Sequence, residues 1–97
     1  MRWTLESAAA ANMNMVRVWG GGKYLPDIFY KMADEMGIMI WQEMAFACAL
    51  YPTSKEFITE IKREISQQVR RLNHHPSIVM WGGNNENEAA LHWYDAP

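Results

Sequence analysis

The sequence contains a single cysteine, Cys48, among its 97 residues. One cysteine cannot form a disulfide within the chain, and it cannot supply the cysteine pair of a typical zinc site. With no obvious base beside it, we expect Cys48 to be buried. An excess of one charge is also missing, because nine Lys and Arg nearly balance eleven Asp and Glu. Since no Lys/Arg run is present to neutralise phosphates, we expect no nucleic-acid partner.

Long apolar runs are absent as well. The apolar stretches are far shorter than the roughly 20 residues that cross a bilayer, so we expect no membrane partner. Residues 1–6 have no apolar segment behind a basic start, and we expect no signal peptide there. Nearly half of the chain is nevertheless hydrophobic (49%), which predicts a globular rather than a disordered chain.

Short apolar runs alternate with helical patterns along the chain. The runs at 15–19, 38–41 and 77–81 predict strands, because they are too short for helices and are flanked by Gly, Asn or Pro. Helices are expected before and between them, at 5–11, 27–36 and 53–72. Strands that alternate with helices predict an α/β fold with parallel strands. Three strands cannot close a barrel of about 250 residues, so residues 1–97 resemble one segment of a larger domain.

Local signals set some of the helix ends. Gly37 stands where a glycine would end the helix 27–36. Thr53, followed three residues later by Glu56, fits a capping box that starts the helix 53–72. His74 and His75 come after that helix, but neighbouring residues point in different directions and no ligand set accompanies them. We therefore expect a turn at this place, and no metal site.

The richest polar cluster follows the strand 77–81, and it comprises Asn84, Asn85, Glu86, Asn87 and Glu88. Chemistry in α/β folds collects at the carboxyl ends of strands, which predicts a site here. An ordinary helix start is the alternative, since Asn caps helices and Glu favours their first turn. The two interpretations are compatible, because a helix can begin directly after a catalytic residue.

The other two strands also end in polar or aromatic residues. Arg17 and Trp19 are one residue apart and hence share one face of a strand. A buried arginine requires an anion, which a carboxylate at another strand end would provide; an ordinary buried ion pair is the alternative. Glu43 follows the second strand, either as a carboxylate that supports a site from behind or as a loop residue.

These clusters together resemble the β-mannosidases of glycoside hydrolase family two. The matching stretches cover nearly the whole chain and are specific because they occur in order, with the strands between them: Ala11-Asn12-Met13-Asn14, Arg17-Val18-Trp19-Gly20-Gly21-Gly22, Phe46 to Pro52, and His75-Pro76-Ser77-Ile78 followed by Trp81 to Glu88. The resemblance implies a partial (β/α)8 barrel with about strands two to four. It also implies a retaining glycoside hydrolase that removes terminal non-reducing β-D-mannose residues without a cofactor.

Roles for individual residues follow from the resemblance alone. Glu86 matches the general acid/base, and Asn85 matches the residue that binds the sugar 2-hydroxyl. Arg17 matches an arginine that contacts the nucleophile, and Trp19 an aromatic residue that lines the subsite for the terminal mannose. Glu43 matches an acidic residue that follows strand three.

The surroundings of the acid/base and the rest of the enzyme are also implied. Trp81 is expected to provide apolar surroundings for Glu86. The family's nucleophile is a glutamate on a later strand, beyond Pro97, so we expect the isolated chain to be inactive. Its partners would be a β-mannoside oligosaccharide and the remainder of the parent chain, with a lysosomal location if the parent is an animal enzyme. A truncated carbohydrate-binding remnant and a hydrolase of another clan are the alternatives.

Overall fold

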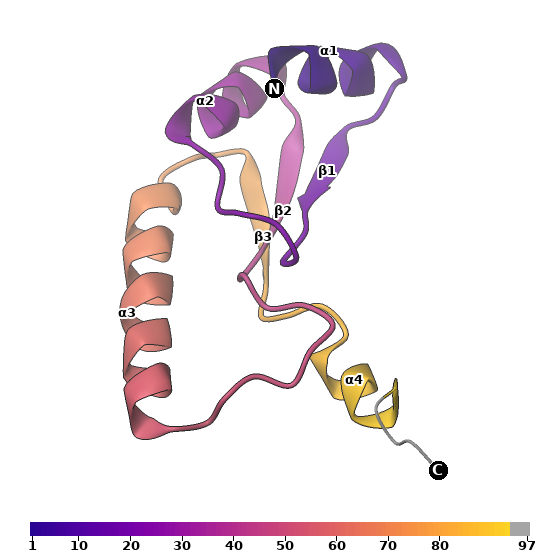
Figure 1. Ribbon diagram of the computed structural model, residues 1–97. Helices are drawn as coiled ribbons and strands as arrows, with labels where there is room; N and C mark the ends of the chain where they lie inside the picture. The colour runs from indigo at the N-terminus through magenta and orange to yellow at the C-terminus, as the bar shows by residue number, and fades with distance from the viewer. Residues whose placement is uncertain (94–97) are drawn as a thin grey trace.

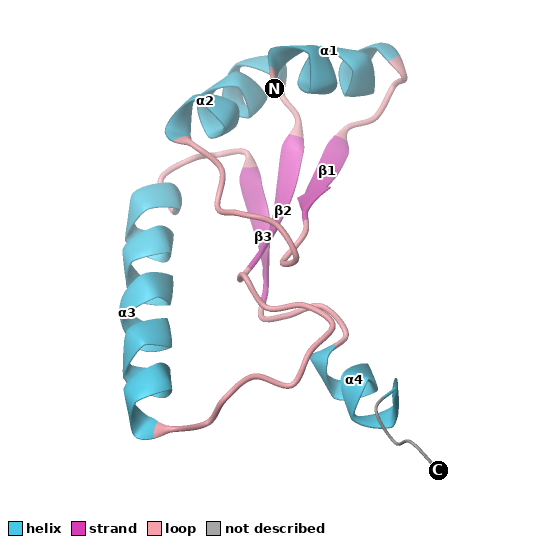
Figure 2. Cartoon of the chain, in the orientation of Figure 1, coloured by secondary structure: helices cyan, strands magenta, loops and turns pink. Residues whose placement is uncertain are grey.

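The computed structural model describes residues 1–93 as an α/β chain (Figures 1 and 2). Helices and strands alternate in the predicted order. The elements are α1 (Arg2–Ala10), β1 (Met15–Val18), α2 (Asp27–Met36), β2 (Met39–Glu43), α3 (Lys55–Leu72), β3 (Ile78–Gly82) and α4 (Asn87–Trp93).

The three strands form one parallel sheet in the order β1-β2-β3. In the register of this sheet Arg17 lies beside Trp41, and Trp41 lies beside Met80. The pairing of β2 with β3 shifts between Ile40 and Trp41. The α/β class and the parallel strands are thus confirmed. Because all three strands run in one direction, their carboxyl ends meet at one edge of the sheet (Figure 2).

Both predicted helix ends can be compared with the structure. Gly37 ends α2 in the left-handed conformation (φ 69°), as its place in the sequence predicted. The prediction of a capping box at Thr53 was wrong. The N-cap of α3 is Ser54, whose Oγ accepts from the Phe57 N–H at 3.2 Å. Thr53 and Ser54 carry the same hydroxyl chemistry, and only the backbone conformation decides between them.

The hydrophobic core lies between α1, α2 and the sheet. Its buried residues are Leu5, Val18, Phe29, Tyr30, Met32, Ala33, Ile38, Ile40 and Leu72. Helix α3 contributes only Leu72, at its carboxyl end, although its apolar residues recur at helical spacing. In Figure 1, α1 and α2 lie together where the strands begin, whereas α3 extends away from them. The apolar side of α3 is therefore largely without a buried partner among the described residues.

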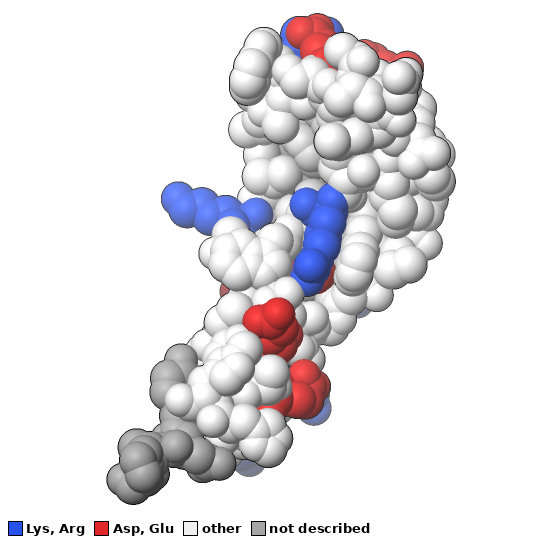
Figure 3. Space-filling model, turned by 90° about the vertical axis from the view of Figure 1, so that its right-hand side faces the viewer, with Lys and Arg blue, Asp and Glu red and all other residues white. Residues whose placement is uncertain are grey.

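The strands are less buried than their composition predicts. Strands that are apolar on both faces are expected to be covered on both faces. On β3, however, Val79 and Met80 are 52% and 47% exposed. On the side shown in Figure 3, Lys or Arg lie near the middle, Asp or Glu lie below them, and further charged residues lie at the top. The sheet thus presents apolar surface that further elements would have to cover.

A polar contact joins α2 to the start of β3, at the edge opposite the polar cluster. His75 Nδ1 lies 2.6 Å from Asp34 Oδ2, and the Ser77 N–H donates to Asp34 Oδ1 at 2.9 Å. Burial of Asp34 opposes its ionisation, but the hydrogen bonds from His75 and Ser77 outweigh burial and lower the pKa of this carboxyl. His75 thus pairs with a carboxylate in the turn before β3.

Candidate functional site

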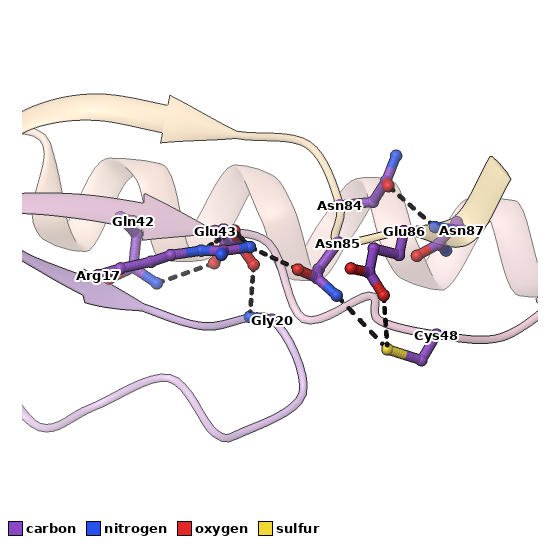
Figure 4. Close-up of polar contacts among 9 residues, drawn as sticks. All are labelled: Arg17, Gly20, Gln42, Glu43, Cys48, Asn84, Asn85, Glu86 and Asn87. Atoms are coloured by element: carbon purple, nitrogen blue, oxygen red, sulfur yellow. Dashed lines mark hydrogen bonds and ion pairs between the residues drawn. The ribbon is translucent and has the colours of Figure 1, made fainter. Parts of the chain in front are cut away.

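An ion pair joins the carboxyl ends of β1 and β2. The Arg17 Nε–H donates to Glu43 Oε1, and Arg17 Nη2 forms an ion pair with the same oxygen. The Gly20 N–H donates to Glu43 Oε2 at 2.8 Å (Figure 4). The Glu43 side chain is 1% exposed. Both of its oxygens therefore have donors, as a buried carboxylate requires.

The expectation of a buried arginine was wrong, although its pairing with a carboxylate from another strand end is confirmed. The Arg17 side chain is 40% exposed, so the buried member of the pair is Glu43. One face of the guanidinium lies over the Trp41 ring, with Cζ 4.6 Å from the ring centroid. This stacking and the ion pair hold Arg17 against the sheet while the rest of the side chain remains accessible.

The glycines after β1 allow the backbone to approach Glu43. A Cβ on Gly20 would lie 2.4 Å from the Met44 carbonyl oxygen and 2.7 Å from that of Phe46, both of them backbone atoms. Only glycine fits between these carbonyls without a backbone shift. At Gly21 a Cβ would meet the Trp19 ring at 2.1 Å, so this indole packs over the glycine turn.

Asn85 extends the ion pair to the end of β3. Arg17 Nη2 donates to Asn85 Oδ1, and this assigns the orientation of the amide. The backbone is fixed as well, because Asn85 N–H donates to Phe46 O, and Cys48 N–H donates to Asn85 O, each at 2.9 Å. A parallel bridge between Ala47 and Asn85 thus continues the pairing of β2 and β3 beyond the strands.

Glu86 follows Asn85 in a left-handed backbone conformation (φ 58°), and its side chain is exposed. Its Oε2 lies 3.9 Å from the Sγ of Cys48, which also accepts from Asn85 Nδ2 at 3.4 Å. Cys48 is itself left-handed (φ 53°). The expectation of a buried Cys48 was wrong, since it is partly exposed and contacts two of the predicted site residues.

The remaining polar residues of the cluster lie at the start of α4 or just before it. Asn84 Oδ1 accepts from the Asn87 N–H at 3.3 Å, and Asn84 Nδ2 donates to Glu88 Oε1 at 3.2 Å. The helix-start interpretation is therefore confirmed for Asn84 and Glu88. It does not conflict with a site at Glu86, which precedes the helix.

The structure thus brings Arg17, Glu43, Asn85 and Glu86 together at one edge of the sheet (Figure 4). The two predicted tryptophans lie outside this chain of contacts. Trp19, 48% exposed, lines an apolar pocket of about 340 Å³ next to β1, together with Val16, Leu25 and Phe29. Trp81 lies beside Gln42 in the register of β2 and β3.

Sequence reasoning missed Cys48, because the contacts of its thiol with Asn85 and Glu86 join segments 37 and 38 residues apart. The signal was present in the Phe46–Pro52 stretch, which lies between β2 and α3. Within residues 1–93, no three His, Cys, Asp or Glu side chains gather as a metal site would require. Over the same residues, no helix combines the length and apolar character needed to cross a membrane.

Several known proteins are similar to this chain in sequence. It is 60% identical over 97 residues to a β-mannosidase of Bos taurus, and 50% identical over 94 residues to a probable β-mannosidase of Caenorhabditis elegans. These alignments cover 98% and 95% of this chain, but only 11% and 10% of the relatives. No protein-family model matches the sequence.

Solved structures are similar over the same length. A β-D-mannosidase of Dictyoglomus thermophilum superposes with a TM-score of 0.86 at 51% identity, covering 89% of this chain and 11% of that one. A β-glucuronidase of Bacteroides uniformis superposes with a TM-score of 0.80 over 98% of this chain. At 22% identity, the second similarity shows a shared fold alone.

Proposed function

The chain is a β-mannosidase-like segment by sequence and by fold, and from this premise we propose that it forms part of the catalytic domain of a retaining glycoside hydrolase of family two. Its three parallel strands would be about strands two to four of a (β/α)8 barrel. The substrate would be a β-mannoside oligosaccharide with a terminal non-reducing mannose. In an animal parent, we propose a lysosomal location.

The observation that carries this proposal is the position of Glu86. Its carboxylate is exposed at the carboxyl edge of the sheet, next to an amide that is held by Arg17. A general acid at this edge of the sheet must reach the glycosidic oxygen of the substrate. Its carboxyl group must therefore be accessible, and its backbone must be fixed. Glu86 meets both requirements, because the Ala47–Asn85 bridge fixes the residue before it and α4 begins directly after it.

Asn85 is suited to the sugar 2-hydroxyl. Its Oδ1 accepts from Arg17, so the Nδ2 amide group must serve the other side. An Asn amide has two N–H donors, and one of them points to Cys48. The second N–H remains for a ligand oxygen. A hydrogen bond to the 2-hydroxyl that strengthens in the transition state would then support glycoside hydrolysis.

Arg17 and Glu43 would support the nucleophile. The contacts of Arg17 use Nε and Nη2, which leaves Nη1 for a carboxylate from another strand. Because Glu43 neutralises the guanidinium from the buried side, Arg17 stays in place whether or not that carboxylate is present. Trp19 would line the mannose subsite and Trp81 would keep the region of Glu86 apolar, as the resemblance implies.

A second candidate function is a carbohydrate-binding remnant without catalysis. It is favoured because the described residues offer no second carboxylate for the reaction beside Glu86. A retaining enzyme needs two carboxylates about 5–5.5 Å apart. In residues 1–93, the other glutamates near this edge are engaged, Glu43 with Arg17 and Glu88 with Asn84. We therefore place the nucleophile on a later strand outside these 97 residues, and propose that this chain alone is inactive.

The test compares Glu86→Gln with Glu88→Gln in a complete enzyme that contains this segment. General acid catalysis contributes roughly 10²–10⁴-fold, so Glu86→Gln should lower kcat/KM by that factor for a β-mannoside with a poor leaving group. The loss should be much smaller for an aryl β-mannoside whose leaving group departs without a proton. Glu88→Gln should not depend on the leaving group, and Asn85→Ala should slow both substrates alike.

The two glutamates thus serve as matched controls for each other. If the good leaving group selectively restores the activity of Glu88→Gln, the general acid/base is Glu88 and the assignment of Glu86 is wrong. If neither variant depends on the leaving group, neither carboxylate protonates the glycosidic oxygen. Activity of the isolated 97-residue chain would contradict the proposal that the nucleophile lies outside these residues.

A further inference from the structure

We propose that Cys48 is a positioning residue for the Glu86 and Asn85 side chains. This inference rests on the proposed function, because it concerns the acid/base and the sugar-binding amide of that same site. The thiol lies between the two side chains. Its Sγ accepts from Asn85 Nδ2 at 3.4 Å, and its S–H is directed to Glu86 Oε2 at 3.9 Å (Figure 4).

The backbone around the thiol is built to present it to Glu86. Cys48 and Glu86 both adopt left-handed conformations, at φ 53° and 58°. Such conformations are unfavourable for an L residue and persist where the surroundings hold them. Here the reciprocal hydrogen bonds from Cys48 N–H to Asn85 O and from Asn85 N–H to Phe46 O hold the two segments together. The two unfavourable conformations thus occur at the residues whose side chains meet.

The amide of Asn85 explains why an acceptor is needed at this position. Arg17 fixes its Oδ1, so Nδ2 must face the Glu86 side. Sulfur is a weak acceptor that holds one N–H without competing strongly with a ligand oxygen for the other. The thiol is also a weak donor, so it restrains the Glu86 carboxylate without forming a charged pair with it. Cys48 thereby orients both groups while leaving them able to bind substrate.

This role differs from that of Glu43, which acts on the opposite end of the same chain of contacts. Glu43 is buried and charged, and it fixes Arg17. Cys48 is neutral and partly exposed, and it fixes the groups that would touch the sugar and the leaving oxygen. Its removal should therefore affect the proton-transfer step more than the shape of the sheet edge.

The experiment uses a complete enzyme containing this segment, with the variants Cys48→Ala, Glu86→Gln and the double variant. A neutral hydrogen bond contributes about 0.5–1.5 kcal/mol, so Cys48→Ala should lower kcat about three- to tenfold for a poor-leaving β-mannoside, with little change in KM. The loss should be smaller for a good-leaving aryl β-mannoside. In the Glu86→Gln background, Cys48→Ala should cost less than it does alone, because the group that it orients no longer transfers a proton.

Leu50→Ala is the matched control, because Leu50 lies in the same loop and is 56% exposed. It should leave both substrates unaffected. Cys48→Ser keeps a donor and an acceptor on a shorter bond and should fall between Cys48→Ala and the parent enzyme. This variant applies the same leaving-group test if Cys48→Ala does not accumulate as a folded protein.

The outcomes separate this inference from the proposed function. Equal losses for both substrates, or an effect that adds fully to that of Glu86→Gln, would mean that Cys48 does not orient the Glu86 carboxyl and would overturn the inference. If Glu86→Gln itself shows no leaving-group dependence, the proposed function fails first, and the role of Cys48 fails with it.

Discussion

Arg17 and Glu43 form an ion pair in which the carboxylate is buried and the guanidinium is 40% exposed. The buried partner is thus the acid, whose other oxygen accepts from the Gly20 N–H. The exposed partner continues to Asn85 on the next strand end. Arg17 therefore connects the ends of all three strands, and the position of Asn85 depends on the shape of a planar, multidentate group.

The first prediction concerns this shape. Arg17→Lys keeps the charge beside Glu43 but cannot reach Glu43 and Asn85 with the fixed fork of a guanidinium. In a complete enzyme containing this segment, kcat/KM should fall about 10- to 100-fold for good- and poor-leaving β-mannosides alike. Arg63→Lys is the control, because Arg63 is 72% exposed and pairs with Glu60 on the surface of α3. An Arg17→Lys enzyme with parent activity would show that charge alone suffices.

The second prediction concerns the glycine turn. Gly20→Ala places a methyl group 2.4 Å from a backbone carbonyl oxygen, and Gly22→Ala places one no closer than 3.6 Å to any atom. Overpacking of this kind costs about 1–3 kcal/mol. Urea unfolding of the complete enzyme should therefore show a loss for Gly20→Ala and almost none for Gly22→Ala. Equal stabilities would show that the loop after β2 moves freely away from Gly20.

Much of this architecture followed from the sequence, for a physical reason. The strands and α2 were predicted from local periodicity. The end of α2 was predicted from Gly37, because glycine readily adopts the left-handed conformation found there. The exposure of Arg17 and the contacts of Cys48 did not follow, because both depend on segments more than 25 residues away. The N-cap at Ser54 was missed because Thr53 offers the same hydroxyl. The sequence thus predicted features that depend on neighbouring residues, but it did not predict side-chain contacts between distant segments.

The third prediction concerns alkaline pH. Burial raises the pKa of Tyr30 to about 12, and its O–H donates to Gln42 Oε1. The folded state therefore favours the neutral phenol, so this contribution to stability is complete below pH 10 and is lost as the pH rises through about 12. Ionisation of the phenol in both the folded and the unfolded state would remove roughly 3 kcal/mol of this stability.

The check on this prediction is Tyr30→Phe, which keeps the ring and removes the titration. In a complete enzyme containing this segment, the difference in unfolding free energy between the parent and Tyr30→Phe should shrink by about 2 kcal/mol from pH 9 to pH 12. Because other tyrosines titrate in both proteins, they cancel in this difference. A difference that stays constant over this range would mean that the Tyr30 phenol ionises as readily in the folded state as in the unfolded one.

The last prediction concerns the 97-residue chain by itself. Its sheet has β1 and β3 as outer strands, and outer strands with free backbone groups pair readily with other chains. Val79 and Met80 are about half exposed, and α3 buries only Leu72. Such a chain lacks the covered core that a domain of this size needs for a cooperative fold. We therefore expect it to aggregate or to behave as a molten chain, as measured by sedimentation velocity and thermal unfolding.

Replacing Val79 and Met80 by Thr should increase the soluble fraction without producing a sharp transition, whereas Lys62→Thr should change neither. A soluble monomer with one sharp thermal transition would show instead that three β/α units suffice to fold.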